Sequence, residues 1–198
     1  MDAPAFWRWA GGPVGRVGAR PDCTRILPNL LVGEYPTPDD TSWLRAEQGV
    51  TAVLSLQDDA DLASKGLELR DLERAYHRAG LRFERMPVPD CDAEFLTARL
   101  DVIVATLHGL LAQGDHVYLH CNAGMNRAPS IAVAYLHVYR AMPLARARDF
   151  VKARRACVPY KRALEARYGA VAPRRSTSRA APCGSRRSSS RGAVRGRR

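Results

Sequence analysis

The sequence predicts an α/β fold in which a central, mostly parallel sheet is flanked by helices. Short runs rich in β-branched and aromatic residues alternate with longer segments whose apolar residues recur at helical spacing. Parallel strands need a crossover connection, usually a helix, and such sheets are covered on both faces. The length of 198 residues fits one such domain with a short segment at either end.

Five short strands are expected from the β-branched and aromatic runs. Residues 25–35 (RILPNLLVGEY) predict a strand, a turn and a second strand, and residues 51–57 (TAVLSLQ) predict a third. A fourth, at residues 81–88, ends in a pair of closely spaced prolines. The fifth, at residues 116–120 (HVYLH), leads directly into a loop of small and polar residues. The carboxyl end of a strand is where open α/β sheets bind their ligands.

Six helices are expected between and after these strands. Thr37 is suited to cap the first, with Asp39 and Asp40 in its first turn and Gly49 at its end. Glycines also stop the next two helices, and prolines separate the last three. The predicted helices are residues 37–49, 71–80, 95–113, 130–141, 144–156 and 160–169.

Composition divides the chain into a flexible N-terminal segment (1–22), a folded domain (23–170) and an Arg/Ser-rich tail (171–198). The tail holds nine arginines and no acidic residue, so the net charge of +11 falls to +2 without it. Its low complexity predicts disorder. Such a tail could bind an anionic partner electrostatically, or only keep the protein soluble.

The five cysteines are odd in number and irregularly spaced, and no C-x-x-C pair occurs. This pattern favours neither a disulfide framework nor a zinc site, and it predicts a reducing compartment, the cytoplasm. The first 22 residues lack the continuous apolar core of a secretory signal. No apolar run approaches the roughly 18 residues of a membrane span, so none is expected.

The loop after the fifth strand, HCNAGMNRAPS (120–130), carries the chemistry. Cys121 directly precedes a predicted helix and lies near Arg127, and both features favour the thiolate form of a cysteine. Gly124 permits a positive φ and a close approach of the backbone to a ligand. The backbone N–H groups of the intervening residues can turn inward to bind a tetrahedral anion, with the guanidinium gripping two of its oxygens. The expected anion-binding residues are Asn122, Ala123, Gly124, Met125 and Asn126.

A histidine followed by C-x5-R resembles the signature of the cysteine-dependent protein tyrosine phosphatase superfamily, and the short domain is similar to its dual-specificity branch. The likeness covers residues 24–168. It implies a three-layer α/β fold and metal-independent hydrolysis of phosphate monoesters in two steps. In that scheme Cys121 attacks phosphorus, Arg127 stabilises the equatorial oxygens, and water then cleaves the cysteinyl phosphate. No metal and no cofactor are expected.

The same resemblance implies a general acid on the loop MPVPDCDAEF. Asp90, which lies 31 residues before Cys121, is favoured because the preceding MPVP then aligns with the family's acid loop without a gap. Asp92 remains the alternative. The histidine before the cysteine, His120, is expected to shape the loop rather than to act as a base. Arg154 and Arg155 near a helix end could favour acidic or phosphorylated substrates, but interaction with the helix dipole is the favoured role.

Within this branch, HCNAGMNRAP, SLQDDADL and RRACVP resemble segments of the glucan phosphatases, which act on phosphorylated glycogen or starch. This chain departs from them at several positions. Asn126 replaces a glycine, and Ser64, Lys65 and Cys91 stand where the plant enzymes have aromatic residues that grip the glucan. Ser55 replaces a redox cysteine, and no carbohydrate-binding module is recognisable. Ala128 replaces the hydroxyl residue found in most dual-specificity enzymes.

The sequence therefore predicts a dual-specificity protein phosphatase acting on phosphotyrosine, phosphoserine or phosphothreonine. A phosphoglucan phosphatase is the first alternative. A catalytically weak pseudo-phosphatase that only binds phosphate is the second, although the intact nucleophile and arginine argue against it. A rhodanese-like sulfur transferase also uses a loop cysteine, but His120 and Arg127 favour phosphate.

Overall fold

The structure is a computed structural model that describes residues 20–169. The predicted N-terminal segment (1–22) falls outside it except for its last three residues. The predicted basic tail (171–198) lies wholly outside the described residues.

Five strands form one sheet in the order β1-β2-β5-β3-β4. Only the edge pair β1·β2 is antiparallel, while β2·β5, β5·β3 and β3·β4 are parallel. This confirms the predicted mostly parallel sheet, and each strand lies inside or within two residues of its predicted segment. The strands are β1 (Cys23–Leu27), β2 (Leu30–Gly33), β3 (Ala52–Ser55), β4 (Arg82–Arg85) and β5 (Val117–His120).

All six predicted helices are present, with their ends shifted by up to four residues. The first is split into a short 3-10 turn and an α-helix, and Thr37 does precede it in a capping box with Asp40. The helical elements are η1 (Pro38–Asp40), α2 (Thr41–Ala46), α3 (Asp59–Ser64), α4 (Leu69–Arg78), α5 (Ala93–Ala112), α6 (Arg127–Tyr139), α7 (Leu144–Lys152) and α8 (Lys161–Tyr168).

Helix α3 was not predicted. It has only six residues, too few for apolar periodicity to be visible. Its local signal is a capping box, in which the Asp58 carboxylate accepts from the Asp61 amide at 2.7 Å and the Asp61 carboxylate accepts from the Asp58 amide at 3.1 Å. This pair of hydrogen bonds satisfies two free donors at the start of the helix and fixes the side chain of Asp61.

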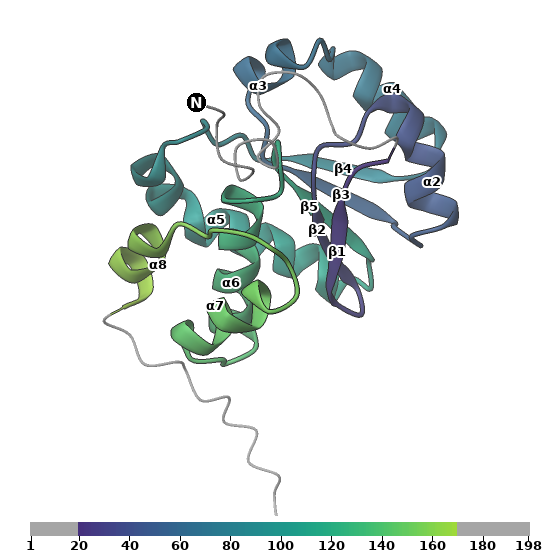
Figure 1. Cartoon of the computed structure of the whole chain (residues 1–198). Helices are drawn as coiled ribbons and strands as arrows, with labels where there is room; N and C mark the ends of the chain where they lie inside the picture. Colours follow the sequence, from purple (N-terminus) through teal and green to yellow (C-terminus); the bar gives the residue numbers. More distant parts are fainter. Residues whose placement is uncertain (1–19, 170–198) are drawn as a thin grey trace, which may run out of the picture.

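Helices cover both faces of the sheet (Figure 1). On one face α5, α6, α7 and α8 enclose the larger core, to which α5 contributes Leu96, Leu100, Ile103 and Leu107. On the other face α2, α3 and α4 enclose a smaller core with Leu44, Leu62, Leu72 and Tyr76. The predicted three-layer arrangement is confirmed. Among the described helices α5 alone is long and apolar enough to span a membrane, but seven of its residues are buried in this core.

The carboxyl ends of the four parallel strands meet at one edge of the sheet. Gly33, Ser55 and Arg85 occupy the same level as His120, because they pair in register through β5 and β3. Strand β5 lies in the middle and is fully buried. The loops that follow these strands therefore converge around the residue after His120, which is Cys121.

Candidate active site

Cys121 follows β5 directly, and α6 begins at Arg127, three residues earlier than predicted. The loop between them, residues 121–126, is hereafter the phosphate loop. The side chains of Cys121, which begins this loop, and of Arg127, which directly follows it, are buried, with exposed fractions of 2% and 1%. Burial of a guanidinium requires several hydrogen-bond acceptors, and the surrounding elements supply them.

The carbonyl groups of the phosphate loop are all bound from outside the loop or by its flanks. The Cys121 carbonyl accepts from His120 Nδ1 (3.1 Å), and the Asn122 carbonyl accepts from Tyr35 N (2.9 Å). Arg155 donates to the next two carbonyls, from Nη2 to Ala123 O (3.3 Å) and from Nε to Gly124 O (2.8 Å). Val158 N donates to Met125 O (2.8 Å), and Asn126 O accepts from Ser130 N (3.0 Å) and Ser130 Oγ (2.7 Å).

This arrangement directs the N–H groups of the loop the other way. In a planar trans peptide unit the C=O and N–H bonds point in opposite directions. Carbonyls held on the outside therefore leave the N–H groups of residues 122–126 facing the interior of the loop. These groups donate to no acceptor among residues 20–169. Together they form a concave set of donors in front of the N-terminus of α6, which suits a tetrahedral anion.

Gly124 is required by the path of this loop. Its φ is +62°, in the left-handed region, and a Cβ at this position would lie 2.6 Å from the backbone of Gly33 and from Arg155 Nη2. The loop is thus packed against the end of β2 with no room for a side chain.

Asn126 explains one departure from the glucan phosphatase pattern. Its φ is −120°, so the position does not need the glycine found in those enzymes. Its side-chain Nδ2 donates to Val158 O at 2.8 Å, on the segment after α7. Because Val158 N also donates to Met125 O, the amide adds a second hydrogen bond between that segment and the phosphate loop.

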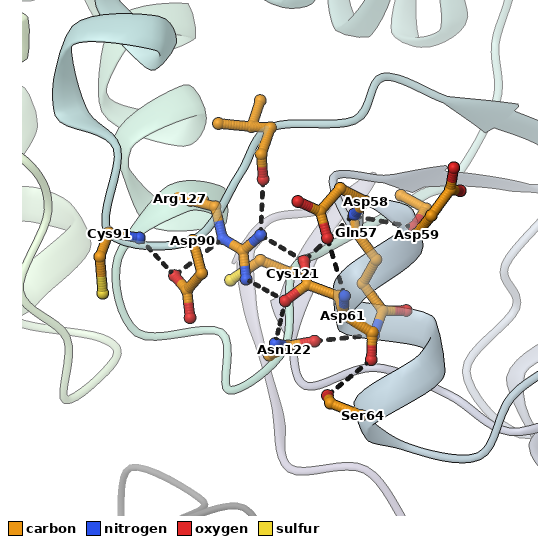
Figure 2. A network of polar contacts seen from close by, with 12 residues as sticks. Gln57, Asp58, Asp59, Asp61, Ser64, Asp90, Cys91, Cys121, Asn122 and Arg127 are labelled. Carbon is orange, nitrogen blue, oxygen red and sulfur yellow. Dashed lines mark hydrogen bonds and ion pairs between the residues drawn. The ribbon is translucent and has the colours of Figure 1, made fainter.

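Arg127 is held by a buried ion pair with Asp61 of α3 (Figure 2). Its Nη1 donates to Asp61 Oδ2 at 2.5 Å and to Val88 O at 2.7 Å. Burial alone would lower the pKa of Arg127, but the neighbouring Cys121, Asp61 and Asp90 outweigh it and raise that pKa. The guanidinium therefore stays charged, and its plane is fixed before any substrate arrives.

Asp61 also orients the phosphate loop. Its Oδ1 accepts a hydrogen bond from Asn122 Nδ2, while Asn122 Oδ1 accepts from Gln57 Nε2 at 2.7 Å (Figure 2). The other Gln57 side-chain atom, Oε1, is buried without a hydrogen-bond partner in the described part of the chain. The Asp61 carboxylate thus connects Asn122, the residue after the cysteine, with Arg127.

The two candidate acids lie in different surroundings. Asp90 Oδ1 is 3.3 Å from Arg127 Nε and accepts from Cys91 N at 3.0 Å, and 49% of its side chain is exposed. Asp92 instead caps α5, where its Oδ1 accepts from Phe95 N at 2.8 Å. Figure 2 shows the Asp90 carboxylate beside the guanidinium, on the side away from Asp61. Of the two, Asp90 is the one whose carboxylate contacts Arg127.

His120 is buried at the start of the loop. Its Nδ1 lies 3.1 Å from Cys121 O, and a carbonyl can only accept, so Nδ1 carries the proton of the neutral ring. Burial lowers the pKa of His120 to about 4, and the hydrogen bond to Cys121 O opposes that shift only in part. A neutral ring that donates to the Cys121 carbonyl supports the loop, in keeping with the expected shaping role.

Arg155 has neither of the roles weighed from the sequence. It is 3% exposed and donates to the Gly124 and Ala123 carbonyls, while its Nη2 forms an ion pair with Asp22 Oδ2 at 3.1 Å. Its Nη1 lies 3.2 Å from Thr24 Oγ1 on β1. The prediction that Arg155 acts mainly through the helix dipole is therefore wrong. Arg155 braces the phosphate loop from behind and connects it to the edge of the sheet.

Sequence reasoning missed Asp61 and Gln57 as site residues and misread Arg155. Asp61 is 66 residues from Arg127, and Arg155 is 31 residues from Gly124. The capping-box pattern of Asp58 and Asp61 would have located α3, but no local pattern states which helix faces the loop. Among the described residues no group of three or more His, Cys, Asp or Glu side chains is placed to hold a metal ion.

Residues 33–164 match the family model described as dual specificity phosphatase, catalytic domain. The chain is 32% identical to laforin of Mus musculus and to the amyloplastic phosphoglucan phosphatase DSP4 of Castanea sativa, in both cases over 68% of this chain. It is 30% identical to dual specificity protein phosphatase 2 of Homo sapiens over 75% of this chain. These matches span 44%, 36% and 40% of the respective relatives, less than half the length of each.

The fold is similar to solved phosphatase structures. The structure of Tk-PTP in the active form superposes with a TM-score of 0.63 and 20% sequence identity, covering 75% of this chain and 97% of that one. The likeness at this level of identity concerns the fold.

Proposed function

Because the chain belongs to the dual specificity phosphatase family by its catalytic domain, we propose that it hydrolyses phosphate monoesters through a cysteinyl-phosphate intermediate. The observation that carries this proposal is the phosphate loop, whose carbonyls are bound outside so that its N–H groups face one point next to Cys121 and Arg127. Such a donor set stabilises the charge on the oxygens of a phosphoryl group in transfer.

In the first step the Cys121 thiolate attacks phosphorus, and the bond between phosphorus and the ester oxygen breaks. The departing oxygen takes a proton from Asp90, so the product leaves as an alcohol or phenol. The N–H groups of residues 122–126 and the Arg127 guanidinium bind the three non-bridging oxygens. Asp61 keeps the guanidinium in place without touching the substrate.

In the second step water attacks the phosphorus of the cysteinyl phosphate. The Asp90 carboxylate accepts a proton from that water, the S–P bond breaks, and inorganic phosphate and the Cys121 thiolate are released. The positive electrostatic potential comes from backbone N–H groups and Arg127, so the proposed mechanism needs no metal and no cofactor.

We propose a phosphorylated protein as the substrate, phosphorylated on tyrosine, serine or threonine. The likeness to dual specificity protein phosphatase 2 supports it. A phosphoglucan is the second candidate, supported by the 32% identity to the chestnut phosphoglucan phosphatase. At the end of α3, where plant glucan phosphatases carry aromatics, this chain has Ser64 and Lys65, which offer no flat apolar face for a sugar ring. We further propose that the enzyme works in a reducing compartment such as the cytoplasm, where Cys121 stays a thiol.

Hydrolysis of 4-nitrophenyl phosphate in the presence of a metal chelator tests the chemistry. The wild-type chain is expected to be active, Cys121→Ser inactive, and Asp90→Ala slowed by about 100-fold or more in kcat. Asp92→Ala is the matched control, since that carboxylate caps α5, and it is expected to keep most of the kcat. Activity that survives Cys121→Ser defeats the mechanism, and a larger loss in Asp92→Ala than in Asp90→Ala reassigns the acid. Absence of hydrolysis in the wild type, with phosphate still bound, would favour the pseudo-phosphatase.

A further inference from the structure

Lys65 lies on the side of α3 that faces the phosphate loop. It is the residue after α3 and still has helical backbone angles, with φ −105° and ψ 0°. Residues four positions apart in a helix share a face, and Lys65 comes four residues after Asp61. Because Asp61 touches both Asn122 and Arg127, Lys65 is placed about 6 Å further along the same face.

Tyr35 fixes the position of the Lys65 side chain. The ammonium Nζ lies 5.5 Å from the centre of the Tyr35 ring, within the range of a cation–π contact. The backbone of Tyr35 is itself part of the site, since its N–H donates to Asn122 O at 2.9 Å. Lys65 is thus held on the Asn122 side of the loop, on a support that is bonded to the loop.

The ammonium has no carboxylate within ion-pair distance among residues 20–169. The nearby acids are used elsewhere: Asp61 pairs with Arg127, and Asp59 pairs with Arg85 at 2.6 Å. Ser64, the other residue at this end of α3, donates its hydroxyl to Asp61 O at 2.7 Å. A half-buried cation beside an anion-binding loop is therefore free to bind a second negative charge.

We propose that Lys65 forms a second anion subsite, which selects phosphorylated peptides with an acidic side chain one or two residues from the phosphorylated one. The inference rests on the proposed function and narrows its substrate class. An extended peptide advances about 3.3 Å per residue, so two residues span about the displacement of Lys65 from Asp61 along the helix, and the position one residue away lies within reach of the long side chain. A flexible four-carbon stem lets the ammonium meet the carboxylate.

The test uses two phosphotyrosine peptides that differ only in carrying glutamate or glutamine at the four flanking positions. The measured quantity is the ratio of kcat/KM for the acidic peptide to that for the neutral one, which cancels any general loss of activity. We expect a two- to fivefold preference for the acidic peptide in the wild type, about the strength of an exposed ion pair. Lys65→Met should bring the ratio close to one, and Lys65→Glu should invert it.

Arg140→Glu is the matched control. It changes the net charge by as much as Lys65→Glu, but Arg140 lies at the opposite end of α6, about 20 Å from the phosphate loop. Its ratio should equal that of the wild type, and added salt should weaken the wild-type preference.

A wild type that hydrolyses 4-nitrophenyl phosphate but treats both peptides alike would overturn the subsite and leave the proposed function standing. So would an unchanged ratio in Lys65→Glu, or faster phosphate release from phosphorylated amylopectin than from either peptide. If the wild type hydrolyses nothing, the proposed function fails and the subsite with it.

Discussion

At the scale of single residues, the buried pair of Asp61 and Arg127 sets the geometry of the site. Only 6% of Asp61 and 1% of Arg127 are exposed, so each charge depends on the other for stabilisation. A buried pair of this kind is weak evidence for net stability, yet removal of one partner leaves an uncompensated charge inside the protein. The same carboxylate also binds Asn122, so one substitution disturbs both ends of the phosphate loop.

Asp61→Ala is expected to lower the free energy of unfolding by about 3 kcal/mol, because it removes the buried carboxylate partner of Arg127 and leaves the guanidinium with only the half-exposed Asp90 and the Val88 carbonyl. Chemical denaturation measures this change. Asp59→Ala is the control from the same helix: its side chain is 92% exposed and pairs with Arg85 at the surface, so its cost should stay below about 1 kcal/mol. Equal effects of the two substitutions would contradict the importance assigned to burial.

His120 should make stability depend on pH. Its pKa is about 4 in the folded protein and 6.5 ordinarily, so the unfolded chain binds more protons between these values. The contribution of the neutral His120 ring to the free energy of unfolding is therefore fully present above pH 6.5. It is lost as the pH drops toward 4, which lowers the free energy of unfolding by up to about 3 kcal/mol. Denaturation across this range should give a steeper slope for the wild type than for His120→Asn. Equal slopes of stability against pH in the two proteins would contradict the lowered pKa of His120.

At the scale of elements, the strands and long helices could be predicted because their signal is local. The twenty residues of α5 carry a clear apolar period, and β5 with the following loop is legible as strand, loop and helix. Helix α3 was not predicted, because its six residues are too few to reveal a helical recurrence of apolar residues. The long-range contacts of Asp61 and Arg155 could not be predicted for another reason. A sequence pattern indicates which face of an element is apolar, but not which residues of distant elements contact each other.

The phosphate loop predicts a clear result for Gly124→Ala. Alanine at this position would have to adopt a left-handed backbone conformation, and its Cβ would lie 2.6 Å from the backbone of Gly33. The loop must therefore move, and its N–H groups then no longer point toward one bound anion. We expect kcat/KM for 4-nitrophenyl phosphate to fall by at least about 100-fold, the cost of losing one oxyanion donor. Gly109→Ala in α5, where an added Cβ would meet no atom within 4 Å apart from its own helix backbone, should be neutral or slightly stabilising. Wild-type rates in Gly124→Ala would contradict this account of the loop.

At the scale of the whole molecule, most of the net charge and the proposed catalytic groups lie in different parts of the chain. The nine arginines of residues 171–198 account for most of the net charge of +11, while Cys121, Arg127 and Asp90 are in the domain. That division was visible in the sequence because charge can be counted by position. What the tail contacts was not, since residues 171–198 lie outside the described part.

Removal of residues 171–198 is expected to lower retention on a heparin column, because nine fewer cations release fewer counterions on binding a polyanion. The salt concentration at elution measures this. The kcat and KM for 4-nitrophenyl phosphate should stay within about twofold, since the removed residues carry no group of the proposed mechanism. Elution at the same salt concentration would show that the tail is not the source of polyanion affinity.

The contacts of Arg155 determine how far the N-terminal side of this domain can be shortened. Family similarity starts at Gly33, yet Asp22 and Thr24, which meet the guanidinium behind the loop, come earlier in the chain. A truncation at the similarity boundary would delete β1 and all of β2 except Gly33, and it would remove two partners of the buried Arg155 guanidinium. Any shortened version intended for biochemistry should therefore retain the chain from a point upstream of Asp22.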